Sequence, residues 1–264
     1  MGVLLLVRHG QASLGAADYD RLSELGYRQA RATGARLARA DLVIDRMVCG
    51  TLARQRDTAV AALAEMPQLA GGRPASGEPA RGGPGGGGPG GGEPGGDEPG
   101  GTELGGTELG ESRLRIDGRL DEYDHTALLA AGTGAGTPAA SFGTATSAEA
   151  NRELQPALEA AIARWAAGDA SAGESHDAFT GRVEAVMADL TREPGCTVAV
   201  TSGGVIAVAC AQALGLPADR WPALARIIVN GSITKFISGR TGTSLLTFND
   251  HAHLEDDRSL ISYR

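Results

Sequence analysis

Cysteine is scarce in this sequence, and hydrophobic runs long enough to cross a membrane are missing. The three cysteines among 264 residues are Cys49, Cys196 and Cys210, and none forms a C-x-x-C pair. Neither a disulfide framework nor a zinc site is expected, and the thiols are predicted to be buried in a reducing cytoplasm. The opening apolar run, residues 3–7, is too short for a signal peptide or a membrane span. These absences favour a soluble, cytoplasmic protein.

Positive charge is also in deficit. The formal net charge is -8 and the isoelectric point is near 5.2. An acidic surface repels nucleic acid and anionic membranes, so neither is an expected partner. Binding of an anionic ligand would then depend on a local basic pocket.

Residues 70–112 differ in composition from the rest of the chain. Proline recurs every five residues from Pro74 to Pro99, within a stretch dominated by glycine. This repeat holds almost no apolar residues, so it cannot bury a core, and its glycines make ordering costly in backbone entropy. We predict a disordered insertion within a single domain that spans residues 1–264.

Outside that insertion, strand-like and helix-like patterns alternate. Continuous apolar or branched runs predict strands at residues 3–7, 42–49, 197–201, 225–229, 232–238 and 244–248. Amphipathic or apolar stretches predict helices at residues 23–40, 51–65, 149–166, 174–191 and 203–214. Pro156 marks either a late start or a kink of one helix. The order predicts an α/β fold, a three-layer α/β/α sandwich around a mostly parallel central sheet.

Chemistry-bearing residues follow the first predicted strand. Arg8, His9, Gly10 and Gln11 come at its carboxyl end, which is where open α/β sheets bind ligands. A neutral histidine held in one tautomer can attack phosphorus, and an arginine beside it can hold two phosphate oxygens. Gly10 is expected to leave room for a substrate.

A second arginine is expected at the same edge of the sheet. Arg54 lies in the first turn of the helix predicted at residues 51–65, where backbone N–H groups and the helix dipole favour anions. Arg56, two residues later, must face elsewhere.

Taken in order, these motifs resemble the histidine phosphatase superfamily, which has the phosphoglycerate-mutase-like fold. The matching segments are Arg8-His9-Gly10 and residues 22–30, 51–54, 58–59, 120–122 and 200–204. The resemblance implies that His9 is the nucleophile and becomes a phosphohistidine. It also implies that Arg8 and Arg54 bind phosphate and that Glu122 is the general acid and base. Asp121 and Asp124 are expected to raise the pKa of Glu122.

The sequence departs from the family pattern at one position. Ser202 stands where the family has a second histidine, just before Gly203 and Gly204. Ser202 and the Gly203 N–H remain candidate phosphate donors, together with Gln11. His125 is the candidate substitute for the missing histidine.

The remaining histidines are weaker candidates. His251 and His253 would share one face of a strand, which could suggest metal binding, but the family needs neither metal nor cofactor, and His176 is assigned no role. The aromatic residues expected either in the core or around a pocket are Tyr123, Trp165, Phe179 and Trp221.

Three functions are compatible with these residues. The first is a phosphomonoesterase acting on a small phosphorylated metabolite, and the second is a phosphomutase on the same scaffold. The third is a phosphate-ligand-binding protein whose catalysis is reduced or lost because of Ser202. Neither the substrate nor the oligomeric state follows from the sequence.

Overall fold

A computed structural model describes residues 1–13, 20–66, 114–132, 148–168 and 173–263 of the chain. The predicted insertion, residues 70–112, lies outside the described residues. Its disorder therefore stays a prediction.

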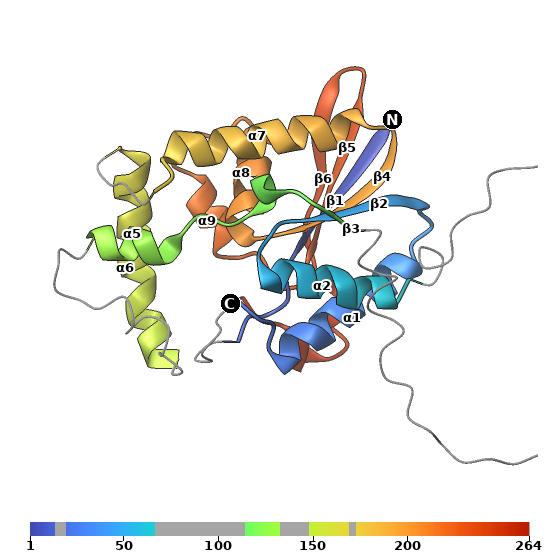
Figure 1. Cartoon of the computed structure of the whole chain (residues 1–264), viewed down its shortest axis with the longest axis horizontal. Helices are drawn as coiled ribbons and strands as arrows, with labels where there is room; N and C mark the ends of the chain where they lie inside the picture. The colour runs from blue at the N-terminus through green and yellow to red at the C-terminus, as the bar shows by residue number, and fades with distance from the viewer. Residues whose placement is uncertain (14–19, 67–113, 133–147, 169–172, 264) are drawn as a thin grey trace, which may run out of the picture.

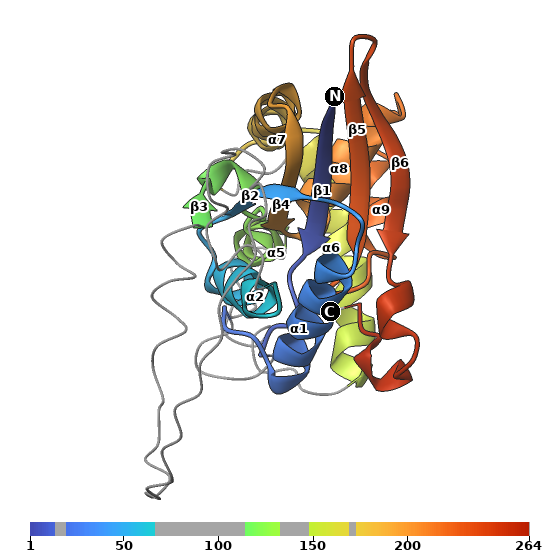
Figure 2. The ribbon, with the colours of Figure 1, turned by 90° about the vertical axis from the view of Figure 1, so that its right-hand side faces the viewer.

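The described residues form a six-stranded sheet with the order β3-β2-β4-β1-β5-β6. The strands are β1 (Gly2–Arg8), β2 (Ile44–Cys49), β3 (Leu114–Ile116), β4 (Gly195–Thr201), β5 (Ile233–Gly239) and β6 (Gly242–Asp250). Neighbouring strands from β3 through β1 are parallel, whereas β5 is antiparallel to both β1 and β6. Figure 2 shows β3 and β6 at opposite edges. The predicted mostly parallel sheet is confirmed.

Helices cover both faces of this sheet. They are α1 (Glu24–Ala38), α2 (Ala53–Ala64), α5 (His125–Gly132), α6 (Ala148–Ala166), α7 (His176–Arg192), α8 (Gly203–Ala213) and α9 (Trp221–Ala225). Three short 3₁₀ helices are η1 (Gly118–Leu120), η3 (Ala252–Leu254) and η4 (Arg258–Leu260). Figure 1 shows α1 and α2 on one side of the sheet, α7 and α8 on the other, and α5 with α6 at one end.

The central strand β1 explains why two helical layers form. Leu4 and Leu6 pack into the apolar cluster shared with α7 and α8, while Leu5 and Val7 pack into the cluster shared with α1 and α2. All four side chains are buried. A strand buried on both faces reads as a continuous apolar run, as the sequence does here.

One expectation about secondary structure is wrong. Residues 225–229 do not form a strand, because α9 ends at Ala225 and an irregular segment follows. Ile228 and Val229 are fully buried there, so their branched side chains serve packing without pairing in a sheet. Of the two possibilities for Pro156, the late start is excluded, because α6 begins at Ala148 and Pro156 lies inside it.

Aromatic side chains form the core beneath α7 and α8. Tyr123, Trp165, Phe179 and Trp221 are all buried, and their ring centroids lie 5.4–5.9 Å apart. His176 joins them, and its Nε2 accepts a hydrogen bond of 3.1 Å from the Trp221 indole. Of the two expectations for these aromatics, the core position is the one observed.

The three cysteines, all within the described residues, are free and buried, as predicted. Burial raises the pKa of the Cys49 and Cys210 thiols to about 12, so both are unreactive at neutral pH. In the part of the chain that the structure describes, no helix has the length and apolar character needed to cross a bilayer.

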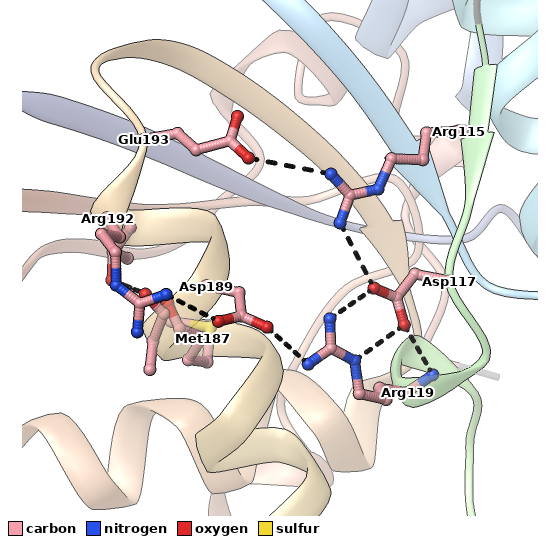
Figure 3. Close-up of polar contacts among 9 residues, drawn as sticks. Arg115, Asp117, Arg119, Met187, Asp189, Arg192 and Glu193 are labelled. Carbon is pink, nitrogen blue, oxygen red and sulfur yellow. Dashed lines mark hydrogen bonds and ion pairs between the residues drawn. The ribbon is translucent and has the colours of Figure 1, made fainter.

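A network of charges fastens β3 and η1 to α7 (Figure 3). Asp117 accepts hydrogen bonds from the Arg119 guanidinium at 2.8 and 3.0 Å, and Arg119 reaches Asp189 at 2.7 Å. Arg115 lies 3.8 Å from Glu193. Hydrogen bonds from Arg119 hold the pKa of Asp117 below its usual range. Such partly exposed pairs contribute little each, but together they fix the chain just before residue 120.

Contact between α1 and α2 depends on a missing side chain at Gly34. A Cβ there would collide with the Ala62 carbonyl. We expect Gly34→Ala to destabilise the protein by about 1–3 kcal/mol through overpacking. Gly181→Ala in α7 is the matched control, because no described heavy atom lies within 4 Å of its Cβ position. This control should stabilise the protein by about 0.5–1 kcal/mol. Urea unfolding of both variants checks the prediction, which fails if Gly34→Ala matches the control.

Candidate active site

His9 leaves the carboxyl end of β1 with its backbone held on both sides. Its N–H donates to the Thr201 carbonyl at 2.9 Å, and its carbonyl accepts from Asn230 Nδ2 at 3.0 Å. The imidazole is buried, with Nδ1 2.7 Å from the Gly10 carbonyl oxygen. A carbonyl can only accept, so Nδ1 carries the proton and Nε2 keeps a lone pair. This is the tautomer that a nucleophilic histidine needs.

Arg54 approaches the other ring nitrogen. Its Nε donates to His9 Nε2 at 3.2 Å, and its Nη1 lies 2.5 Å from Asp20 Oδ1. The other Asp20 oxygen accepts from the Ala53 N–H at 2.7 Å, so this carboxylate caps the N-terminus of α2. Arg56 is exposed, as its position in the helix predicts. Asp20 was not identified from the sequence, since it lies far from α2 along the chain.

Arg8 lies beside the N-terminus of α8. A Cβ added to Gly203 would sit 3.6 Å from Arg8 Nε, so the glycine gives this guanidinium room. Arg8 Nη1 donates to the Tyr263 carbonyl at 2.9 Å and also to the Ile228 carbonyl. The guanidinium is thereby oriented by backbone oxygens.

Glu122 lies opposite, against the start of α8. Its Oε2 accepts from the Gly204 N–H at 2.9 Å, and a side chain on Gly204 would collide with the carboxylate. Burial raises the pKa of Glu122, against the opposing attraction of Arg54 and Arg8. The direction expected from the sequence is confirmed, but the expected cause is wrong. The Asp121 carboxylate instead accepts from the Thr51 N–H and hydroxyl at 2.6 and 2.5 Å.

The same two arginines act on His9. Burial first, then the charges of Arg54 and Arg8, hold the pKa of the imidazole well below its ordinary value. Both arginines also lower the pKa of Glu122. Arg54 bonds His9, and Arg8 and Glu122 both lie against the first turn of α8, so the four side chains lie around one place, where the histidine is neutral at neutral pH.

Three elements hold the segment that carries Glu122. The Leu120 carbonyl accepts from Thr201 Oγ1 at 2.6 Å and from Gln55 Nε2 at 3.0 Å. The Asp121 carbonyl accepts from Arg182 Nη1 at 2.7 Å. These bonds tie the segment to β4, α2 and α7. Gln55 and Arg182 were missed by sequence reasoning, because their bonds go to backbone atoms that no sequence pattern marks.

Ser202 is the N-cap residue of α8 and is fully buried. Its hydroxyl accepts a hydrogen bond of 2.8 Å from Gln55 Nε2. This contact ties Ser202 to the polar bonds beneath the site. Its assignment as a phosphate donor stays a prediction, as does that of the Gly203 N–H.

His125 opens α5 and is half-buried. Burial, followed by the charge of Arg54, lowers its pKa, so the imidazole is neutral at neutral pH. Its role as a substitute stays a prediction.

His251 and His253 do not share a strand face, so that expectation is wrong. Strand β6 ends at Asp250, and the two residues belong to the turn around η3. His253 Nε2 lies 3.2 Å from Thr33 Oγ1. Across the described ranges, no group of three or more His, Cys, Asp or Glu side chains could hold a metal ion.

Gly10 serves packing, and its expected role in leaving room for a substrate stays a prediction. A Cβ on Gly10 would collide with the Gly26 carbonyl, so the missing side chain lets this loop lie on α1. Gln11 donates its N–H to Gln29 Oε1 at 2.8 Å, and its Oε1 accepts from the Ser23 hydroxyl at 3.0 Å. Whether Gln11 also contacts phosphate stays a prediction.

Comparison with known proteins gives a family match. The model described as histidine phosphatase superfamily (branch 1) matches residues 4–70 and 140–251. No curated protein matches the sequence.

Solved structures share the fold at low sequence identity. A phosphoserine phosphatase mutant from Entamoeba histolytica, in complex with phosphoserine, has a TM-score of 0.55 and 17% identity, covering 96% of this chain and 100% of that one. A phosphoglycerate mutase from Bacillus anthracis has a TM-score of 0.54 and 16% identity, covering 96% and 95%. A mycobacterial glucosyl-3-phosphoglycerate phosphatase has a TM-score of 0.53 and 22% identity, covering 94% and 99%.

The burial of Glu122 makes a prediction about stability. Its raised pKa means that the folded protein binds this proton more tightly than the unfolded chain, so wild-type stability falls as pH rises through that pKa. Glu122→Gln keeps an oxygen for Gly204 without the charge. We expect the variant to be more stable than wild type at neutral pH and to lose this advantage as pH falls to the ordinary value of 4.5. Thermal unfolding across pH checks this. A variant less stable than wild type at neutral pH would contradict it.

Proposed function

Because the chain belongs to the histidine phosphatase superfamily, we propose that it is a phosphomonoesterase that works through a phosphohistidine on His9. The observation that carries the proposal is geometric: Arg54 bonds His9, and Arg8 and Glu122 both lie against the first turn of α8. Burial favours the neutral form of His9 and the protonated form of Glu122. The substrate class is a small phosphorylated metabolite. The family match supports a phosphatase or mutase activity in general, and the residue roles below are our inference.

In the first step, His9 Nε2 attacks the phosphorus atom and forms the P–N bond as the ester P–O bond breaks. Glu122, which enters protonated, gives its proton to the leaving alkoxide. The Nδ1–H of His9 keeps its hydrogen bond to the Gly10 carbonyl, and this bond orients the ring so that the Nε2 lone pair can attack phosphorus. Burial favours the protonated form of Glu122, as this role requires.

In the second step, water attacks the phosphohistidine. The Glu122 carboxylate takes a proton from the water, the P–N bond breaks, and inorganic phosphate leaves. His9 and protonated Glu122 are regenerated. A low imidazole pKa supports this cycle, because a protonated His9 could not attack again.

Arg8 and Arg54 stabilise the charge on the transferring phosphoryl oxygens. The Nε–H of Arg54 donates to His9 Nε2, the atom whose lone pair must attack phosphorus. Phosphate binding therefore requires Arg54 to transfer this hydrogen bond to a phosphoryl oxygen. We assign further contacts to Gln11, Ser202 and the Gly203 N–H.

We propose that His125 supplies the donor that the family places at position 202. Its lowered pKa keeps the imidazole neutral, so one ring N–H is available to donate, and His125 follows Glu122 by three residues. A phosphate-binding protein without catalysis would need neither a nucleophile nor an acid. The retained His9 and Glu122 therefore favour turnover. We also propose a cytoplasmic location, which the buried, free thiols support.

Removing the proposed nucleophile His9 or the proposed phosphate-binding residue Arg54 should lower the rate of phosphate release. We expect His9→Ala to lower kcat for an aryl phosphate by about 10⁴-fold or more, and Arg54→Ala by about 10²–10³-fold. Arg56→Ala is the matched control, since it removes an exposed arginine two residues away on the same helix. Release of inorganic phosphate without added metal is the measurement.

Equal phosphate release by wild type and His9→Ala would reject the phosphatase hypothesis and favour the hypothesis of a phosphate-binding protein. Transfer of phosphate between two positions of a sugar acid, without net release, would establish the mutase instead.

His125 has a prediction of its own. We expect His125→Ala to lower kcat by about 10²-fold, as the loss of one donor to the transition state does. His251→Ala, a partly exposed histidine after β6, should leave kcat unchanged. The same phosphate-release assay measures both variants. Full activity in His125→Ala would reject the hypothesis that His125 replaces the second histidine of the family.

A further inference from the structure

Three polar side chains lie behind the His9 loop and take no part in the chemistry described above. Gln29 of α1 and Asn230, which precedes β5, are both fully buried. Ser262 lies near the end of the described chain. Buried amides need partners for both their oxygen and their nitrogen, so their hydrogen bonds account for why they are there.

Their bonds form a closed ring through the nucleophile loop. The Gln11 N–H donates to Gln29 Oε1 at 2.8 Å, and Gln29 Nε2 donates to Ser262 Oγ at 2.8 Å. The Ser262 hydroxyl donates to Asn230 Oδ1 at 3.0 Å, and Asn230 Nδ2 donates to the His9 carbonyl at 3.0 Å. Each amide accepts at its oxygen and donates from its nitrogen, and the hydroxyl both accepts and donates. Gln29 Nε2 also donates to the Leu260 carbonyl at 2.7 Å.

The ring acts on the two peptide groups that orient the imidazole. Gln29 holds the N–H of the planar peptide whose oxygen belongs to Gly10, and this oxygen accepts the Nδ1–H of His9. Asn230 holds the carbonyl of the preceding peptide. When one ring nitrogen of a histidine reacts, the hydrogen bond made by the other ring nitrogen fixes the tautomer and the ring orientation. For His9, that second bond runs from Nδ1 to the Gly10 carbonyl.

Resting on the proposed function, we propose that Ser262 is a positioning residue for His9. Its hydroxyl joins the two amides, so that the peptides on either side of Gly10 are held together. Without it, Asn230 Oδ1 loses the Ser262 hydroxyl while buried, and Gln29 Nε2 keeps only the Leu260 carbonyl, so nothing joins the two amides. The imidazole would then spend less time aimed at phosphorus.

The segment around Ser262 does not depend on this hydroxyl for its place. The Ser262 carbonyl accepts from the Asn230 N–H at 2.8 Å, and the Leu260 carbonyl accepts from Gln29 Nε2 at 2.7 Å. The Tyr263 carbonyl accepts from Arg8 at 2.9 Å. Ser262→Ala therefore removes the hydroxyl that links Gln29 to Asn230, while backbone carbonyls still hold the segment in place.

The experiment compares Ser262→Ala with Ser262→Thr and with Ser259→Ala. Ser259 lies in the same segment, is exposed, and bonds Asp257 at 2.6 Å. For Ser262→Ala we expect kcat to fall about 10-fold with KM unchanged within about twofold, since misaimed chemistry affects kcat and not ground-state binding. Ser262→Thr keeps the hydroxyl and should restore kcat, and Ser259→Ala should match wild type.

Amide hydrogen exchange gives a readout besides activity. In Ser262→Ala, the Gln11 N–H should exchange at least about 10-fold faster, while the Val198 N–H in β4 stays protected as in wild type. Wild-type kcat and wild-type Gln11 exchange in Ser262→Ala would overturn the proposal. Equal acceleration at Gln11 and Val198 would also overturn it, because it would mean general destabilisation. If wild type and His9→Ala release phosphate equally, the proposed function fails, and Gln11 exchange still tests the ring.

Discussion

An imidazole kept neutral beside two permanent cations is the constraint on which the site depends. Burial and the charges of Arg8 and Arg54 all act against protonation of His9, while the Gly10 carbonyl holds its remaining proton. The two arginines also face Glu122, whose burial favours its protonated form. Burial thus has opposite effects on the two pKa values, which separates a base-like from an acid-like group without any metal ligand. Each sheet and helix contact described above keeps these four side chains together.

Much of the fold follows from patterns that the sequence carries locally. The apolar run of β1 predicts a strand buried on both faces, and Leu4 and Leu5 indeed pack into different clusters. The run at Ile228 misleads, because branched side chains also fill a core from irregular backbone. Short elements such as β3 hold too few residues to show a period. Their place is set by partners far along the chain.

For the candidate site, the sequence predicted the residues proposed to react but not the residues that hold them in place. Arg8, His9 and Arg54 follow strands or open helices, and such positions can be recognised from composition and spacing. The side chains that orient them, such as Asp20, Gln55 and Asn230, bind backbone atoms or charges brought near only by folding. Ser202 belongs with these, because its hydroxyl meets Gln55 beneath the site. No local pattern marks such residues. The expected cause of the raised pKa of Glu122 was wrong because its burial also arises only on folding.

The charge network on β3 and η1 affects how this chain tolerates a change in the length of the connection between α2 and β3. Glu122 follows residue 114 by a short stretch. Arg119 binds this stretch to Asp189 of α7, the Asp117 N–H binds it to the Cys49 carbonyl of β2, and Asp121 binds it to Thr51 and Arg182. These anchors hold Glu122 from within the folded domain, so its position does not depend on the length of the connection between α2 and β3.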